Sequence, residues 1–333
     1  MPELPEVETV VRELRAHLPG KHVLRASLTA PDLYRRGSAQ IAELAGARIQ
    51  RVDRRGKAIV ISLEPAGEGA TGPDRLVVHL GMTGRLEWIS QGRAGGAEPG
   101  LPATFAPRGM AKRQALRVRS EPVKKTHLHA RWEFRDGSEL RYFDPRRFGF
   151  IFVGTAEAVD GTLRIGPDPF ELDADGLARA LGGRSASIKS LLLHQELVSG
   201  LGNIYVDEAL HLARIHPSLS GERASKHATT ILAAARRILT RAIKGRGTTL
   251  RDYRRTDGTR GEFQMKLSVY GREGEPCRRC ATKIRRIVVG QRGTHFCPRC
   301  QRGPRVSATP SGRSRADRSR RAAPRRADYT RSR

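Results

Sequence analysis

Four cysteines near the end of the chain constrain its fold more than any other feature. They form two Cys-x2-Cys pairs separated by sixteen residues, and they are the only cysteines present: Cys277, Cys280, Cys297 and Cys300. Each pair can present two thiolates on one side of a tight bend, so the two bends together can close a tetrahedral site. In a chain of 333 residues this pattern indicates a metal site rather than a disulfide scaffold. We therefore predict one structural zinc ion.

The net charge of the chain points to a polyanionic partner. Lysine and arginine number 62 against 34 acidic residues, a formal charge of +28. Nucleic acid fits this excess better than an anionic membrane, because the sequence lacks a long apolar run, a signal peptide and a dominant basic amphipathic helix. Arginines flank the four cysteines, so the segment between them is a candidate DNA-contacting finger. We expect a cytoplasmic protein.

The hydrophobic pattern predicts strands first and helices later. After an initial helix, short apolar runs predict strands at 21–29, 47–53, 57–63, 75–80, 131–135, 139–143 and 149–153. Such strands indicate an antiparallel sandwich or barrel of about 150 residues. From about residue 168 the apolar spacing becomes helical, with helices expected at 170–182, 187–197, 203–213 and 222–243.

Three stretches have the composition of loops or tails. A segment near 90–124 is rich in Gly, Pro, Ala and Arg and is typical of an insertion in a loop. A polar, glycine-punctuated loop at 248–268 is expected to move. Residues 303–333 are of low complexity, with Asp317 and Asp328 as their only acids, and predict a disordered basic tail.

The first residues are the strongest candidates for chemistry. Once an initiator methionine is trimmed, Pro2 becomes a secondary amine with a pKa of about 8, so a useful fraction is neutral at neutral pH. Such an amine can attack C1′ of a deoxyribose and form an iminium ion that assists later eliminations. Glu3, its neighbour, could shuttle protons. An ordinary helix start explains the same residues, since prolines and acids suit a first helical turn.

Five further residues are weaker candidates, each with a structural alternative. Lys57 begins a strand and is a turn residue or a phosphate contact. Arg146 and Phe148 lie in a turn that could wedge into a base stack, unless Phe148 is buried in a hairpin. Met82, taken alone, suits a core. We expect Asn203 to be the N-cap of a helix whose first N–H groups are free to hold a phosphate.

These motifs together resemble the bacterial formamidopyrimidine-DNA glycosylase family over residues 2–301. The resemblance rests on the stretches Pro2 to Thr9, Arg55 to Lys57, His79 to Gly84, Asp144 to Gly149, Gly200 to Leu210, Val269 to Cys277, and the four cysteines. It implies an α+β multidomain fold. The expected parts are an N-terminal helix with an antiparallel β-sandwich (1–160), a helix-two-turns-helix domain (161–265), a β-hairpin zinc finger (266–302) and the tail (303–333).

The resemblance also implies an activity and roles for the candidate residues. The expected enzyme is a monomer, associated with the nucleoid, that removes 8-oxoguanine and ring-opened purines from damaged double-stranded DNA and nicks the strand by β,δ-elimination. Pro2 would be the nucleophile, Glu3 the proton donor and Glu6 part of the same site. Lys57 would donate a proton and contact a phosphate, and Arg292 would serve δ-elimination. The implied DNA contacts are Met82, Arg146 and Phe148 in the gap left by the extruded base, Asn203 on a phosphate, and the 251–267 loop over that base.

Two alternatives remain open at this point. Endonuclease VIII-type relatives share Pro2 and Glu3 but prefer oxidised pyrimidines, whereas Leu4, Val7 to Thr9 and the Met82 and Arg146 to Phe148 motifs favour the purine-specific branch. A noncatalytic zinc-finger DNA binder would explain the charge and the cysteines. It would leave the joint occurrence of Pro2, Glu3 and Lys57 without a reason.

Overall fold

A computed structural model describes residues 2–67, 71–91, 127–248, 256, 259 and 261–303. Almost all of the predicted insertion at 90–124, most of the 251–260 segment and the tail beyond residue 303 lie outside these ranges. Residues 1–303 form one compact unit. No helix among the described residues is long and apolar enough to cross a membrane.

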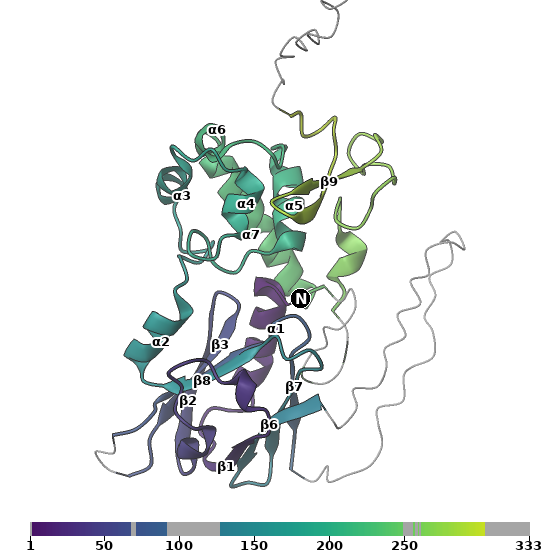
Figure 1. The fold of residues 1–333 in the computed structure, drawn as a ribbon. Helices are drawn as coiled ribbons and strands as arrows, with labels where there is room; N and C mark the ends of the chain where they lie inside the picture. The colour runs from purple at the N-terminus through teal and green to yellow at the C-terminus, as the bar shows by residue number, and fades with distance from the viewer. Residues whose placement is uncertain are drawn as a thin grey trace, which may run out of the picture. The chain divides into compact units, whose positions relative to one another are not determined.

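The first part of this unit is a helix followed by two antiparallel four-stranded sheets (Figure 1). Helix α1 covers Leu4–Arg15. One sheet has the order β1-β6-β7-β5, with strands Val23–Leu28, Leu128–Phe134, Glu139–Phe143 and Arg85–Ile89. The other has the order β2-β3-β4-β8, with strands Arg48–Arg55, Ala58–Glu64, Arg75–His79 and Phe150–Gly154. The predicted antiparallel sandwich is confirmed, and β5 is a strand that the apolar pattern did not predict.

Strand β3 shows why the sandwich sequence takes this form. Its residues Ala58 to Leu63 are all buried because both faces of the strand are covered. Ile59 and Ile61 face the core that both sheets share with α1. Val60 faces a smaller cluster with Val159 of α2 (Ala156–Leu163), a helix that was not predicted. Two 3₁₀ turns, Pro31–Leu33 and Ile41–Leu44, complete this part.

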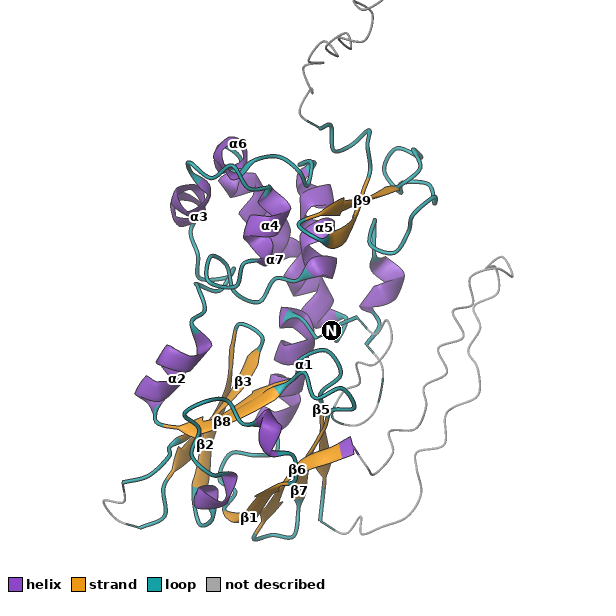
Figure 2. Cartoon of the chain, viewed as in Figure 1, coloured by secondary structure: helices purple, strands orange, loops and turns teal. Residues whose placement is uncertain are grey.

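The second part consists of helices that share one core (Figure 2). They are α3 (Ala174–Leu181), α4 (Ile188–Leu193), α5 (Asn203–Ala213), α6 (Gly221–Ser225) and α7 (Ala228–Lys244). Side chains of Asp173, Ser187 and Ser220 cap α3, α4 and α6. The single helix predicted at 222–243 is wrong, because the chain breaks between α6 and α7. Leu4 of α1 belongs to this helical core, so the first turn of the chain joins both parts.

A two-stranded hairpin ends the described chain. Strands β9 (Arg285–Val289) and β10 (Arg292–Phe296) pair antiparallel. Both turn residues have positive φ, 54° at Gly290 and 60° at Gln291, as a two-residue hairpin turn of this twist requires. A β-carbon at Gly290 would lie 2.4 Å from Oγ of Ser190, so glycine lets the turn approach α4. The predicted hairpin is confirmed. A 3₁₀ turn at Phe263–Lys266 lies in the segment before it.

Candidate active site

The N-terminal end of α1 carries two buried carboxylates. Glu3 and Glu6 are 2% and 1% exposed, and the backbone N–H of Glu3 donates to Oε2 of Glu6 at 2.9 Å. The carboxylate of Glu3 accepts hydrogen bonds from the backbone N–H groups of Ile204 at 3.0 Å and Tyr205 at 3.3 Å. Those groups open α5, where free N–H groups and the helix dipole favour a negative charge. Pro2, also buried, precedes Glu3 directly.

The start of α5 differs from the prediction. The N-cap is Gly202 and not Asn203, which is the first residue of the helix. The first N–H groups are not free to hold a phosphate, because Glu3 occupies two of them. A β-carbon at Gly202 would lie 2.2 Å from the carboxyl carbon of Glu3. Glycine is therefore required at this position for the acid to reach the helix.

Burial makes both carboxylates hold protons more tightly than usual. Desolvation raises the pKa of Glu3, and the charge of Lys57 and the two α5 N–H groups oppose that rise. Desolvation and the neighbouring Glu3 charge raise the pKa of Glu6 from 4.5 to about 7. The charge of one carboxylate raises the pKa of the other, so the two buried groups titrate as a pair.

Two residues that the sequence did not single out by role complete the surroundings of Glu6. The Tyr205 hydroxyl donates to Oε1 of Glu6 at 2.5 Å, and the Thr248 backbone N–H donates to the same oxygen at 2.6 Å. The hydroxyls of Tyr205 and Thr248 are 2.9 Å apart. Burial and the Glu6 charge raise the pKa of Tyr205 well above its usual value, so the phenol stays protonated and donates. No local pattern indicates a contact across 43 residues.

The charges of Arg292 and of the two buried glutamates all act on Lys57. Lys57 occupies the turn between β2 and β3. Burial lowers its pKa, the charges of Glu3 and Glu6 raise it, and Arg292 lowers it further. The group is therefore close enough to all three to feel their charge. A lysine whose pKa is lowered gives up its proton more readily than an exposed lysine does. The charges of Glu3, Glu6 and Arg292 thus all act on Lys57, and Pro2 directly precedes Glu3 in the chain.

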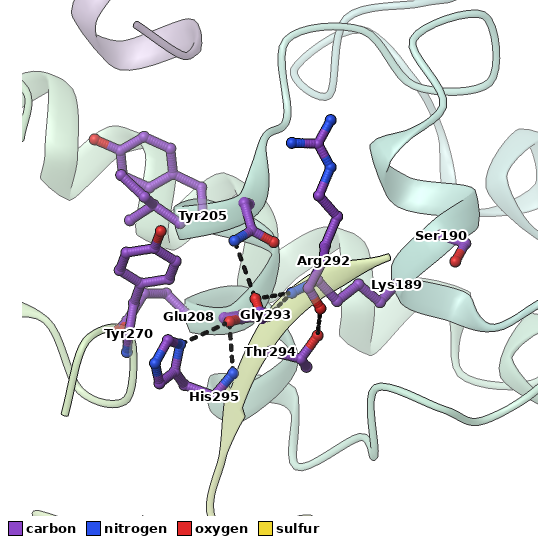
Figure 3. A network of polar contacts seen from close by, with 12 residues as sticks. Lys189, Ser190, Tyr205, Glu208, Tyr270, Arg292, Gly293, Thr294 and His295 are labelled. Atoms are coloured by element: carbon purple, nitrogen blue, oxygen red, sulfur yellow. Dashed lines mark hydrogen bonds and ion pairs between the residues drawn. The ribbon is translucent and has the colours of Figure 1, made fainter. Parts of the chain in front are cut away.

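A buried polar network fixes the hairpin that carries Arg292 (Figure 3). The ammonium group of Lys189 is fully buried and donates to Oδ1 of Asp207 at 2.7 Å and to the carbonyl of Gly293 at 3.1 Å. The Asn203 amide donates to that same carbonyl at 3.1 Å. The backbone N–H of His295 donates to Asp207 at 2.8 Å. Asn203 is therefore linked through one oxygen to the residue after Arg292.

One residue of this network, Lys189, could have been noticed in the sequence. Lys189 stands among the apolar residues Ile188, Leu191 and Leu192 of α4. A lysine on the core side of a helix must be paired to be buried. Figure 3 shows the Arg292 side chain extending away from this network, where its guanidinium remains exposed.

The three side chains expected to fill a gap in the base stack are exposed. Met82 is 38% and Phe148 53% accessible, so the alternative of a buried Phe148 is wrong. The Arg146 guanidinium lies 4.4 Å from the centre of the Phe148 ring, a cation–π contact. The three residues come from two neighbouring turns, 81–84 and 144–149.

The four cysteines converge as a metal site requires. Their sulfur atoms all lie within 4.8 Å of one another, with Cys280 and Cys297 3.5 Å apart and Cys277 and Cys300 4.0 Å apart. Zinc–sulfur bonds of about 2.3 Å in a tetrahedron separate the sulfurs by about 3.8 Å. The predicted site for one structural zinc ion is confirmed: four thiolates fit this ion, and a closed set of four protein ligands makes it structural.

Comparison with known proteins agrees with these parts in order. Residues 1–151 match the formamidopyrimidine-DNA glycosylase N-terminal domain, residues 165–253 the H2TH domain of the same glycosylase, and residues 274–303 the zinc finger found in FPG and IleRS. The chain is 40% identical to the formamidopyrimidine-DNA glycosylase of Symbiobacterium thermophilum, covering 96% of this chain and 95% of that one.

Solved structures give the same result. A structure of MutM with DNA containing carbocyclic 8-oxo-G is 33% identical with a TM-score of 0.70, covering 91% of this chain and 100% of that one. A mutant of the Lactococcus lactis FPG with DNA containing Fapy-dG is 33% identical with a TM-score of 0.71, at the same coverage. Fold and site together define a zinc-finger DNA glycosylase. The chain belongs to the formamidopyrimidine-DNA glycosylase family.

Proposed function

We propose that this protein excises oxidised purines, 8-oxoguanine and formamidopyrimidines, from duplex DNA and then nicks the strand as an AP lyase. The burial of Glu3 directly after Pro2, on the first N–H groups of α5, carries the proposal, and the charge of Lys57 acting on Glu3 supports it. The related structures hold DNA with 8-oxo-G and with Fapy-dG, which supports the purine substrates. We place the enzyme in the cytoplasm, on the nucleoid, acting as a monomer.

The proposed chemistry begins at Pro2. Its amine, free after removal of Met1, attacks C1′ of the damaged nucleotide. The bond from C1′ to the base breaks with its electron pair on the base, and the proton that the amine loses balances the proton that the departing base takes up. The sugar ring then opens at O4′, which takes a proton from Glu3, and nitrogen and C1′ form an iminium ion. The raised pKa of Glu3 supports this role, because a carboxyl group must hold a proton in order to give one.

Strand cleavage follows from the charge on the iminium ion. That charge makes the C2′ proton acidic, and its loss expels the 3′ phosphate; a second elimination expels the 5′ phosphate. Lys57 would bind a flanking phosphate and transfer protons, and Arg292 would hold the phosphate that leaves in the second step. The charges of Glu3 and Arg292 both act on Lys57, which supports these assignments.

The remaining candidates would hold the DNA. We propose that Met82, Arg146 and Phe148 enter the gap left by the extruded base, because they are exposed and clustered. Asn203 would contact a phosphate. We further propose functional parts at 1–160, 161–265, 266–302 and 303–333.

Borohydride trapping on duplexes with single defined lesions tests the proposal. The protein with a free Pro2 should form a covalent adduct on 8-oxoguanine and formamidopyrimidine duplexes, and Glu3→Gln should lose base excision because an amide cannot give a proton. Mass spectrometry confirms removal of Met1. An adduct formed by protein that retains Met1 would refute Pro2 as the nucleophile, and a preference for oxidised pyrimidines would favour the endonuclease VIII-like alternative.

A further inference from the structure

The 144–149 turn is held by a carboxylate that has no part in the roles above. Asp144 follows β7 directly and is fully buried. Its Oδ1 accepts from the Thr83 hydroxyl at 2.5 Å and the Arg146 N–H at 3.4 Å. Its Oδ2 accepts from the Gly149 N–H at 2.8 Å and the Tyr142 hydroxyl at 3.1 Å. These four donors fill the lone-pair positions that a carboxylate offers.

Three of these donors stand beside the three side chains proposed to enter the base stack. Thr83 follows Met82 in the chain, the second donor is the backbone of Arg146 itself, and Gly149 follows Phe148. One carboxylate therefore fixes the backbone next to all three. It also ties together two turns that are 61 residues apart in sequence.

The two turns have little freedom to move by themselves. The Arg146 N–H also approaches the Thr83 hydroxyl, at 3.3 Å. A β-carbon at Gly81, whose φ is +56°, would lie 2.3 Å from the backbone carbon of Phe148. The turns are thus in direct backbone contact, whereas the side chains of Met82 and Phe148 project into solvent. This backbone contact limits how the two turns can move relative to each other.

We infer that Asp144 is a positioning residue for base extrusion, which holds the Met82 turn and the Arg146–Phe148 turn at the spacing that lets them enter the base stack together. The inference rests on the proposed function. Inserting side chains into a duplex requires the bases to unstack, so side chains whose backbone is already held in place lose less binding free energy to ordering. Asp144 does not touch the reacting atoms, so extrusion should depend on it and the lyase chemistry should not.

The primary test is Thr83→Val, which removes one donor from Asp144 and keeps the shape of the half-exposed side chain. Single-turnover rates are measured on one duplex carrying 8-oxoguanine and on the same duplex carrying an abasic site, which has no base to extrude. We expect excision of 8-oxoguanine to fall about tenfold. Nicking of the abasic site should stay within about twofold of the wild type. Thr83→Ser, which restores the hydroxyl, should restore excision.

Asp144→Asn should show the same selective loss. Its NH₂ group replaces one carboxylate oxygen and cannot accept, so the groups that donate to that oxygen lose their acceptor. Asp136→Asn is the matched control. Asp136 also accepts from a backbone N–H and a hydroxyl, both of Ser138, but in the turn at the other end of β7. It should leave both rates unchanged.

The outcomes separate this inference from the function on which it rests. A wild-type protein that gives no trapped adduct on any lesion contradicts the proposed function. An active wild type contradicts the inference alone if Thr83→Val and a folded Asp144→Asn both excise normally, or if they lose excision and abasic nicking equally. If Asp144→Asn does not fold, Thr83→Val decides.

Discussion

At the scale of single residues, the first turn of α1 buries two acids that accept hydrogen bonds from backbone N–H groups and a phenol and lie within the influence of a lysine charge. Glu3 and Glu6 both lie at the first turn of α1, yet their hydrogen bonds come mainly from residues about 200 positions later. Their protonation is therefore a property of the folded chain, and it should be visible in stability as well as in chemistry.

The raised pKa of Glu6 predicts a stability that falls as pH rises. Unfolded Glu6 titrates near 4.5 and folded Glu6 near 7, so between these values the folded state binds more protons. Its stabilising contribution is full below pH 4.5 and is lost as pH rises through 7. The loss is on the order of 3 kcal/mol. Urea unfolding between pH 4.5 and 7.5 should show a shallower pH slope for Glu6→Gln. An exposed control, Glu157→Gln, should keep the wild-type slope.

Gly202 predicts a second residue-scale effect. In Gly202→Ala the new β-carbon would overlap the Glu3 carboxyl group, so Glu3 must leave the start of α5. We expect single-turnover excision to fall at least about tenfold with zinc content unchanged. Gly161→Ala is the control, because its β-carbon would meet nothing within 4 Å and alanine favours the helix there. Equal rates for both variants would remove the steric argument.

At the scale of elements, helices α4 and α5 are joined to the hairpin by the pair Lys189 and Asp207. Lys189→Met would leave the buried Asp207 carboxylate without its ammonium partner, with the His295 backbone N–H still donating to it. We expect a loss of about 3 kcal/mol in the free energy of unfolding. Lys226→Met, on the exposed end of α6, should change stability by less than about 0.5 kcal/mol. Denaturant titration followed by circular dichroism measures both, and similar midpoints would show that the pair contributes nothing.

The zinc hairpin predicts a loss confined to its own element. Cys297→Ala should release zinc, because three thiolates no longer close the tetrahedron, and the hairpin is too small to fold without its metal. Duplex binding should be lost while the sandwich stays folded, because its core lies between the two sheets. Zinc stoichiometry and near-ultraviolet circular dichroism report the two effects. A near-zero zinc content in the metal-replete wild type would refute the site.

Elements with a strong local pattern were predictable and others were not. The buried run in β3 and the helical spacing at 203–213 identify their elements, and α5 has the predicted bounds. Strand β5 alternates charged and apolar residues over only five positions, and Leu86 alone is buried, so its pattern is too short to identify it from the sequence. The break between α6 and α7 contains neither glycine nor proline, and tertiary packing decides it.

Some residues of the candidate site were likewise predictable from the sequence and others were not. Glu3 and the cysteines are visible because their chemistry depends on neighbours in sequence. Two hydrogen bonds join positions about 200 residues apart: the Ile204 N–H donates to Glu3, and the Tyr205 hydroxyl donates to Glu6. No local sequence pattern predicts contacts between such distant residues. The prediction that Asn203 is the N-cap, with free N–H groups after it, was wrong for this reason: a local rule for helix caps takes no account of a distant acid that accepts from those N–H groups.

At the scale of the whole molecule, charge is unevenly distributed along the chain. Residues 303–333 hold ten arginines and two aspartates. Each neutralised phosphate contributes about −0.9 to the slope of log affinity against log salt. Removing these residues should therefore make the salt slope on undamaged duplex shallower and weaken binding at low salt. Excision at saturating enzyme should be unchanged. Identical slopes for both proteins would mean that the tail does not engage DNA, and a large loss of excision would mean that it reaches the active site.

The seating of Glu3 on α5 also constrains how such a gene can change. The acid is encoded near the first codon, and the glycine and helix that receive it are encoded some 200 codons later. A recombinant that joins the first half of one relative to the second half of another inherits the two pieces from different parents. It stays active only if acid and receiving turn still match in size. Selection therefore acts on this distant pair as one inherited unit, and exchange between lineages is permitted only where it leaves that unit whole.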